Sequence, residues 1–141
     1  MDMNPKAVGE RSEAMVLARF LRAGLVVLTP FGDSQRYDMV VDDDGTFVRI
    51  QCKTGRLKDG KITFPTCSTN WNQGTRRDYR GEIELFAVYC PETDLVYVVP
   101  IGEVGIKVAT LRVTLARNGQ TKNVRLASDY LFNGSLTQLV A

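Results

Sequence analysis

Residues 36–53 read RYDMVVDDDGTFVRIQCK, and this stretch decides the fold. Its Asp44-Gly45 dipeptide is favoured in type I′ turns, so we expect a β-hairpin in which Asp38 faces Gln51. Lys53 then lies on the same face as Gln51, because side chains alternate along a strand. The opposite face is apolar and carries Met39, Val41, Val48, Ile50 and Cys52. One face of the hairpin is therefore expected to build a core, while the other gathers an acid, an amide and a lysine.

The composition is that of a globular protein. The chain has 141 residues, of which 44% are hydrophobic and 24% charged, which suits a single domain over 1–141. It has no apolar run of the ~20 residues that would span a membrane, and no secretory segment near Met1. Its three cysteines form no Cys-x-x-Cys pair, which indicates reduced thiols in a cytoplasmic protein. The absence of histidine excludes serine–histidine catalysis and histidine–metal nuclease sites.

Positive charge is concentrated in one segment. Residues 49–80 carry eight Lys and Arg side chains against two Asp, a local net charge of +6 in a chain whose total is +2. Such a stripe is the electrostatic footprint of a phosphate-backbone partner, although a solvated surface has the same composition.

The rest of the chain combines one helix with several apolar strands. Asn4-Pro5 is a helix-start signal and Gly24 a stop signal, so a helix is expected over 5–23. Residues 66–82 are polar and rich in Arg and Asn, which indicates a long functional loop. Strands are expected at 25–29, 61–65, 84–90, 95–100 and 111–115, with a turn at 117–120, residues 124–126 pairing back, and a short helix or irregular tail from Ser128. This order predicts an α/β fold with a mixed central sheet.

The hairpin face that holds Asp38 has the groups of a metal site. Mg²⁺ prefers oxygen ligands and leaves positions open for substrate phosphate. Asp38 supplies a carboxylate, Gln51 a weaker amide oxygen and Cys52 a backbone carbonyl. Lys53 can orient or deprotonate an attacking water and offset charge on the phosphate. An Asp that faces a Gln is usually structural, but the lysine that follows and the basic surroundings favour a site.

A second carboxylate is expected from the helix. Glu13 shares a helical stripe with Leu17 and Phe20, so it should point toward the sheet, where a carboxylate is costly unless it is paired or metal-bound. Glu10 lies one turn earlier and is the alternative. Either residue can instead have a structural role in capping or in an ion pair.

Three motifs resemble those of a known family. Gly9-x-x-x-Glu13, Arg36-Tyr37-Asp38 and Gln51-Cys52-Lys53 are similar to motifs of the PD-(D/E)XK nuclease superfamily. The stretches 79–83, 86–93 and 96–100 resemble the small group of these endonucleases that includes a tetrameric group I intron homing endonuclease. The resemblance covers residues 5–126, and Gln51 stands where the superfamily usually has an acid.

The resemblance implies a restriction-endonuclease-like core, with a mixed sheet flanked by helices. Glu13, Asp38, Gln51 and Lys53 would be catalytic, and Asp38, Gln51 and Cys52 would bind Mg²⁺. The implied activity is sequence-specific hydrolysis of double-stranded DNA to 5′-phosphate and 3′-hydroxyl ends, with no organic cofactor. Cutting both strands requires a homodimer at least, and the resemblance raises a homotetramer. A nuclease resembling Holliday-junction resolvases and a non-catalytic DNA-binding protein stay open as alternatives.

DNA contacts are expected from the basic segment and from residues 66–82. The predicted contacts are Arg36, Arg56, Lys58, Lys61, Asn70, Asn72, Arg76, Arg77, Tyr79 and Arg80. Trp71 is either a base-stacking residue or part of a core or interface. Arg36 is either a phosphate clamp or the ion-pair partner of the acids at 42–44. Those acids either bind a metal or are simply solvated.

Overall fold

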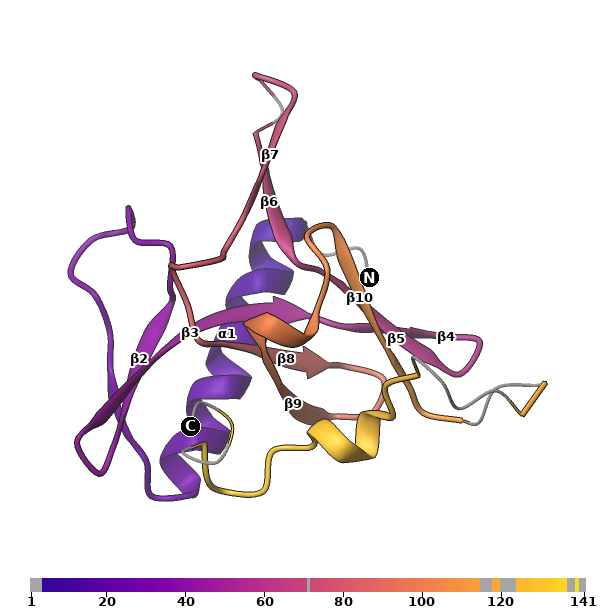
Figure 1. The fold of residues 1–141 in the computed structure, drawn as a ribbon. Coiled ribbons are helices and arrows are strands. Elements are labelled where there is room, and N and C mark those ends of the chain that lie inside the picture. Colours follow the sequence, from indigo (N-terminus) through magenta and orange to yellow (C-terminus); the bar gives the residue numbers. More distant parts are fainter. Residues whose placement is uncertain (1–3, 71, 115–117, 120–123, 137–138, 140–141) are drawn as a thin grey trace.

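The computed structural model describes residues 4–70, 72–114, 118–119, 124–136 and 139. Figure 1 shows a long helix against a five-stranded sheet, a smaller sheet beside it, and a hairpin that projects from the body. None of the helices in the described part of the chain is long and apolar enough to cross a membrane.

The central sheet has the strand order β1-β2-β3-β8-β9. Its strands are β1 (Val26–Leu28), β2 (Met39–Asp43), β3 (Thr46–Thr54), β8 (Leu85–Cys90) and β9 (Leu95–Pro100). β3 and β8 run parallel, whereas the other neighbours are antiparallel. The predicted mixed α/β sheet is therefore confirmed. Every residue of β8 is buried, as expected for a parallel strand covered on both faces.

The β2–β3 hairpin has the predicted register. Its pairing puts Asp43 opposite Thr46 and Met39 opposite Ile50, whereas Asp38 lies just before β2 and donates its N–H to the Ile50 carbonyl at 2.8 Å. Asp44 and Gly45 have φ angles of 54° and 91°, the positive values that a type I′ turn requires at both central positions. The predicted apolar face is buried and consists of Met39, Val41, Val48, Ile50 and Cys52.

Helix α1 (Pro5–Arg22) covers that apolar face. It begins as predicted, because Oδ1 of Asn4 accepts a hydrogen bond from the Ala7 N–H at 2.8 Å. The buried stripe runs through Ser12, Val16 and Phe20, one residue away from the expected stripe at its start. Glu13 is consequently half-buried at the margin of the helix–sheet contact instead of pointing into it.

A second, three-stranded sheet covers the other face of the central sheet. It has the order β10-β5-β4 and consists of β4 (Arg56–Lys58), β5 (Lys61–Pro65) and β10 (Val108–Arg112). Ile62, Phe64 and Leu111 from this sheet form a core with Phe86 and Val88 of β8. The central sheet thus has α1 on one face and a small sheet on the other.

Residues 66–82 were predicted as a loop, and this prediction is wrong. They contain β6 (Cys67–Asn70) and β7 (Thr75–Asp78), an antiparallel hairpin that stands out from the body in Figure 1. An arm solvated on both faces has no apolar alternation, so its sequence has the composition of a loop. Trp71 lies outside the described residues.

The C-terminal region also differs from expectation. The strand predicted at 111–115 begins earlier and ends at Arg112. Residues 117 and 120 of the predicted turn at 117–120 lie outside the described residues, and Leu126 forms an isolated parallel bridge to Arg112. The described residues also include two named 3₁₀ helices, η1 (Ile101–Glu103) before β10 and η2 (Ala127–Tyr130) after it.

Candidate active site

Asp38 immediately precedes β2, and its carboxylate turns back onto β3. Because β2 begins only at Met39, the Cys52 N–H has no strand partner on that side, and Oδ2 of Asp38 accepts its hydrogen bond at 2.8 Å. Burial raises the pKa of Asp38, while the hydrogen bond from Cys52 and the charge of Lys53 oppose that rise. The sheet thus holds a partly desolvated carboxylate at a fixed position.

Glu13 reaches the same place from α1. Its pKa is raised by burial and further by the negative charges of Asp38 and Glu10. Burial, with the charges of Asp38 and Glu13, also raises the pKa of the Cys52 thiol well above its ordinary value. The structure therefore brings Glu13 and Asp38 together around Cys52, whereas Glu10 is exposed.

A buried hydroxyl pair anchors α1 beside these carboxylates. Ser12 Oγ and Thr54 Oγ1 are 2.5 Å apart, and Ser12 is one of the few buried polar residues of the described chain. Each hydroxyl is adjacent in sequence to a candidate catalytic residue, Glu13 or Lys53. Nothing in the sequence marks this pair, because it joins residues far apart in the chain.

Gln51 and Lys53 alternate with Cys52 and so point away from the α1 side of β3. The Asp38 carboxylate, expected on the face of Gln51 and Lys53, is instead bonded to the Cys52 N–H between the two. The Nε2 of Gln51 donates to the Cys52 carbonyl at 3.3 Å. The Nζ of Lys53 donates to the Tyr79 hydroxyl at 3.2 Å and to the Cys67 carbonyl at 3.4 Å. All four predicted catalytic residues therefore lie on or beside residues 51–53, near the end of β3.

The donor set fits a hard divalent cation. Among the described residues, neither Asp38 nor Glu13 forms an ion pair, and the mutual repulsion of their charges would be relieved by a cation. The described part of the chain has no cluster of three or more Cys, Asp or Glu side chains that could hold a metal. Two neighbouring carboxylates, Asp38 and Glu13, are the kind of donors taken by Mg²⁺, which typically uses one or two carboxylates and completes its shell with waters and substrate phosphates. The acids at 42–44 likewise form no such cluster, and Asp42 instead accepts a hydrogen bond from the Gly45 N–H.

A depression of about 430 Å³ opens beside this site. It is lined by Pro5, Val8, Gly9, Cys52, Lys53, Thr54, Arg56 and Pro65. A side chain at Gly9 would project into open space, so the glycine leaves the depression wide at the start of α1. The depression connects Lys53 with Arg56 and hence with the small sheet.

Two predicted DNA contacts, the half-buried Arg36 and the buried Tyr79, are bonded to other parts of the protein. Tyr79 is 4% exposed, so its side chain faces Lys53 rather than an external ligand. Arg36 forms its ion pair with Glu82, at 3.2 Å, and not with the acids at 42–44. The guanidinium group also stacks over the Tyr79 ring, 4.0 Å from its centroid. Both residues therefore connect the hairpin β6–β7 to the site.

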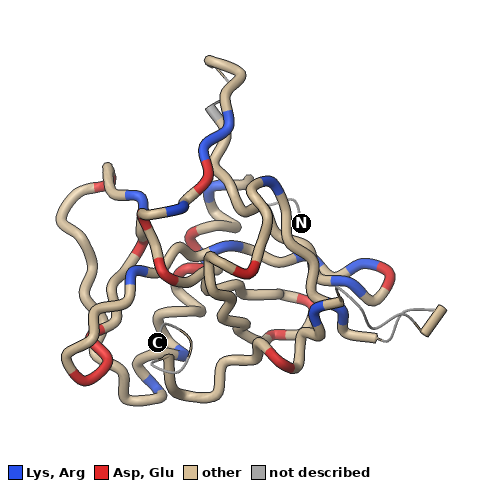
Figure 2. The backbone as a smooth tube through the Cα atoms, viewed as in Figure 1, with Lys and Arg blue, Asp and Glu red and all other residues tan. Residues whose placement is uncertain are grey.

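Three cations form a row across the small sheet. Lys58 pairs directly with Lys61, and Lys61 with Arg112 on the next strand. Figure 2 shows the cations of β4 and β5 on either side of an acidic turn. Like charges opposite one another in a sheet are unfavourable, and among the described residues none of the three has an acidic partner. Arg112 was not predicted, because only the pairing of distant strands places it beside Lys61.

The remaining predicted contacts differ in their exposure and in the groups that they contact. Arg56 lies 3.9 Å from Glu92, Arg77 is paired with Glu82 at 3.0 Å, and Arg80 donates to the Val104 carbonyl at 2.9 Å. Arg76 and Asn72 are exposed on the projecting arm, and the backbone of Asn70 pairs with Thr75.

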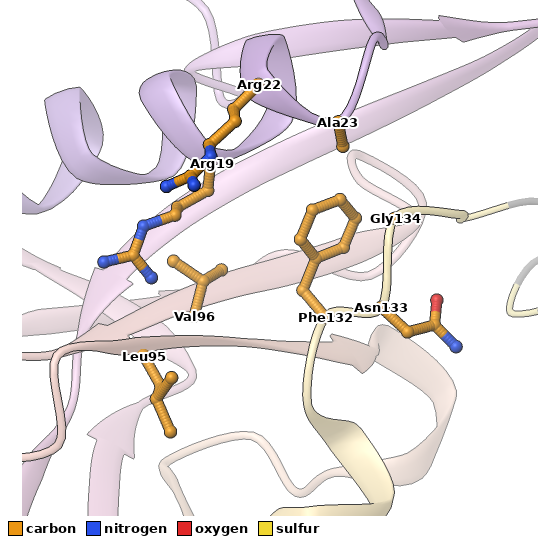
Figure 3. Close-up of a pocket in the computed structure, with 8 residues that line it drawn as sticks. All are labelled: Arg19, Arg22, Ala23, Leu95, Val96, Phe132, Asn133 and Gly134. Carbon is orange, nitrogen blue, oxygen red and sulfur yellow. The ribbon is translucent and has the colours of Figure 1, made fainter.

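A second pocket lies at the C-terminal end of α1, as Figure 3 shows. It has a volume of about 260 Å³ and is lined by Arg19, Arg22, Ala23, Leu95, Val96, Phe132, Asn133 and Gly134. None of these lining residues carries a carboxylate or belongs to the predicted site, so this pocket offers no metal ligands of that kind.

Comparison with known proteins agrees with this geometry. A family model described as PD-(D/E)XK endonuclease matches residues 3–133. The solved structure of a bacterial homing endonuclease, I-Ssp6803I, is similar with a TM-score of 0.73 and 26% sequence identity, over 92% of this chain and 89% of that chain. A search of curated proteins gave no match.

The carboxylate pair predicts an unusual pH dependence of stability. The pKa of Asp38 and of Glu13 is higher in the folded than in the unfolded chain, whose ordinary values are 3.8 and 4.5. Their stabilising effect is therefore complete below those values and is lost as the pH rises through the raised pKa values. We expect Asp38→Asn to raise the thermal unfolding midpoint at neutral pH by a few degrees and to flatten its dependence on pH. Asp33→Asn, at an exposed position, is the control, and a lower midpoint for Asp38→Asn would contradict the assignment.

Proposed function

Because the chain belongs to the PD-(D/E)XK endonuclease family, we propose that it is a Mg²⁺-dependent endonuclease that cuts double-stranded DNA at specific sequences. The observation that carries the proposal is the convergence of Asp38, Glu13 and Lys53 at one end of β3. The likeness to a bacterial homing endonuclease supports sequence specificity.

The candidate catalytic side chains have different roles in the proposed hydrolysis. Asp38 and Glu13 would hold Mg²⁺, with Gln51 or the Cys52 carbonyl as a neutral ligand. When bound, Mg²⁺ lowers the pKa of water and offsets charge on the phosphate. Lys53 donates through its Nζ, so it can hydrogen-bond an attacking water or a phosphate oxygen. With no histidine in the chain, proton transfer rests on these carboxylates, Lys53 and water.

DNA would run from the depression onto the small sheet. Arg56 lines the depression and belongs to β4, so positive charge continues from Lys53 to the row of Lys58, Lys61 and Arg112. This surface can neutralise successive backbone phosphates. The arm β6–β7, which carries the exposed Arg76, has the form of a β-ribbon that enters a groove. A projecting arm favours linear duplex DNA over the flat surface expected for a junction.

A second copy of the chain would complete the enzyme. Cutting both strands requires two sites, and a symmetric dimer provides them. Val26 and Phe47 are 58% and 62% exposed, and they flank Asp42 in one row across three strands, with Leu28 beside them at 44%. This apolar sheet face, on the side opposite α1, is the surface proposed for self-association, in a homodimer or a homotetramer.

Cleavage assays test the activity directly. With Mg²⁺, we expect double-strand cuts in a minority of a pool of duplexes with randomised centres, with 5′-phosphate ends. Asp38→Ala should lower the cleavage rate by at least ~100-fold and leave DNA binding in Ca²⁺ largely intact, whereas Asp33→Ala should cut normally. Cleavage of four-way junctions alone would favour the resolvase alternative. If linear, supercoiled and branched DNA all stayed uncut, the alternative of a non-catalytic DNA-binding protein would be favoured.

The cationic row predicts a change in salt dependence. Lys61→Ala and Arg112→Ala should each weaken binding to every duplex by a similar factor and lower the slope of log K against log[salt] by about 1. Arg22→Ala, a cation at the far end of α1, should leave the slope unchanged. The measurement is a salt titration of binding to a random-sequence duplex in Ca²⁺. Equal slopes for Lys61→Ala, Arg112→Ala and the unmodified protein would show that DNA does not bind along this cationic row.

The apolar face predicts which substitution disrupts self-association. Phe47→Lys places a cation opposite Asp42, which the strand pair tolerates, and should convert the dimer or tetramer to monomers in analytical ultracentrifugation. Ile106→Lys is a matched control, because Ile106 is a similarly exposed apolar residue, at 52%, outside the central sheet. An unmodified protein that sediments as a monomer would contradict the proposal.

A further inference from the structure

The base of the projecting arm holds the candidate catalytic lysine. Cys67 is the first residue of β6, and Tyr79 directly follows β7. These two residues supply both acceptors for the Lys53 Nζ, at 3.4 Å and 3.2 Å. A lysine side chain with four rotatable bonds is thereby confined by groups that belong to the arm and not to its own sheet.

Tyr79 is itself held tightly on several sides. Its side chain is 4% exposed, and its ring packs edge-on against Phe86 with centroids 5.6 Å apart. The Arg36 guanidinium lies 4.0 Å from the ring centroid. The hydroxyl that meets Lys53 therefore has a fixed position as long as the arm stays in place.

Arg36 ties both strands of the arm to the segment that carries Asp38. Its Nη1 donates to Ser68 Oγ in β6 at 2.6 Å, and its Nη2 donates to the Asp78 carbonyl in β7 at 2.7 Å. Arg36 is only two residues from Asp38, while Tyr79 contacts Lys53. The arm is thus linked by separate contacts to the segment of the metal-binding carboxylate and to the lysine.

We infer that Tyr79 is a positioning residue, which fixes Lys53 relative to the scissile phosphate and makes the lysine position depend on the seating of the arm. The inference rests on the proposed nuclease function and extends it to a residue that is not one of the four predicted catalytic side chains. It replaces the predicted direct contact of Tyr79 with DNA. DNA bound by the arm would then change the cleavage rate, because it would shift the Tyr79 hydroxyl and with it the Lys53 Nζ.

The test removes that hydroxyl and keeps the ring. Tyr79→Phe should slow single-turnover nicking of supercoiled plasmid with Mg²⁺ by roughly 10- to 100-fold, as loss of a group that orients a catalytic side chain does. Binding to a random-sequence duplex in Ca²⁺ and the unfolding midpoint should stay the same. Tyr97→Phe is the matched control, since Tyr97 is 3% exposed in the same core and its hydroxyl bonds Thr93, at 3.2 Å, and not Lys53. A Tyr79→Phe rate equal to that of Tyr97→Phe, or a parallel loss of DNA affinity, would overturn the inference.

A second readout does not depend on cleavage. The ¹⁵N ammonium signal of Lys53, assigned by its loss in Lys53→Arg, should be visible in the unmodified protein because hydrogen bonds protect its protons from exchange. It should shift or vanish in Tyr79→Phe and remain in Tyr97→Phe. Absence of the signal from the unmodified protein would overturn the inference even if Tyr79→Phe failed to fold. If no DNA is cleaved by the unmodified protein, the proposed function fails, and the ammonium signal still decides whether Tyr79 holds Lys53.

Discussion

The hydrogen bond from the Cys52 N–H to the Asp38 carboxylate, at 2.8 Å, is the contact on which the site depends. It exists because the Asp44-Gly45 turn fixes the register of β2 on β3, and because β2 begins at Met39, opposite Ile50, and so does not extend to Cys52. A slip of one residue would exchange the two faces of the strand and send Asp38 into the core. Fold and candidate chemistry are therefore set by the same pairing.

The site lies at the sheet, between two hydrophobic cores that pack on its opposite faces. Met39, Ile50 and Cys52 pack under α1, while Phe86 and Val88 on the opposite face pack under the small sheet. The carboxylates of Asp38 and Glu13 lie where neither α1 nor the small sheet buries them fully. They are partly buried, and their negative charges repel one another. Such an arrangement lowers stability at neutral pH, and this cost is expected of a site whose charges await a cation.

Local chemistry explains which parts were predictable from sequence. The helix cap at Asn4, the Asp44-Gly45 turn and the alternation of apolar residues act within a few positions of the chain, and each is found as expected. The arm β6–β7 was missed because its strands lack an apolar face. The link between Ser12 and Thr54, the place of Arg112 in the cationic row and the contact of Tyr79 with Lys53 all join distant segments, and composition or spacing carries no sign of them.

The central claim is that Asp38 and Glu13 form one cation site next to Lys53. A crystal structure of the protein with duplex DNA and Ca²⁺ tests it most directly, because Ca²⁺ binds oxygen ligands at about 2.3–2.6 Å. The account predicts a cation bound by an Asp38 oxygen, with Glu13 on its other side and a backbone phosphate oxygen completing the shell near Lys53. A cation at the 42–44 turn, or DNA lying away from Asp38, would contradict it.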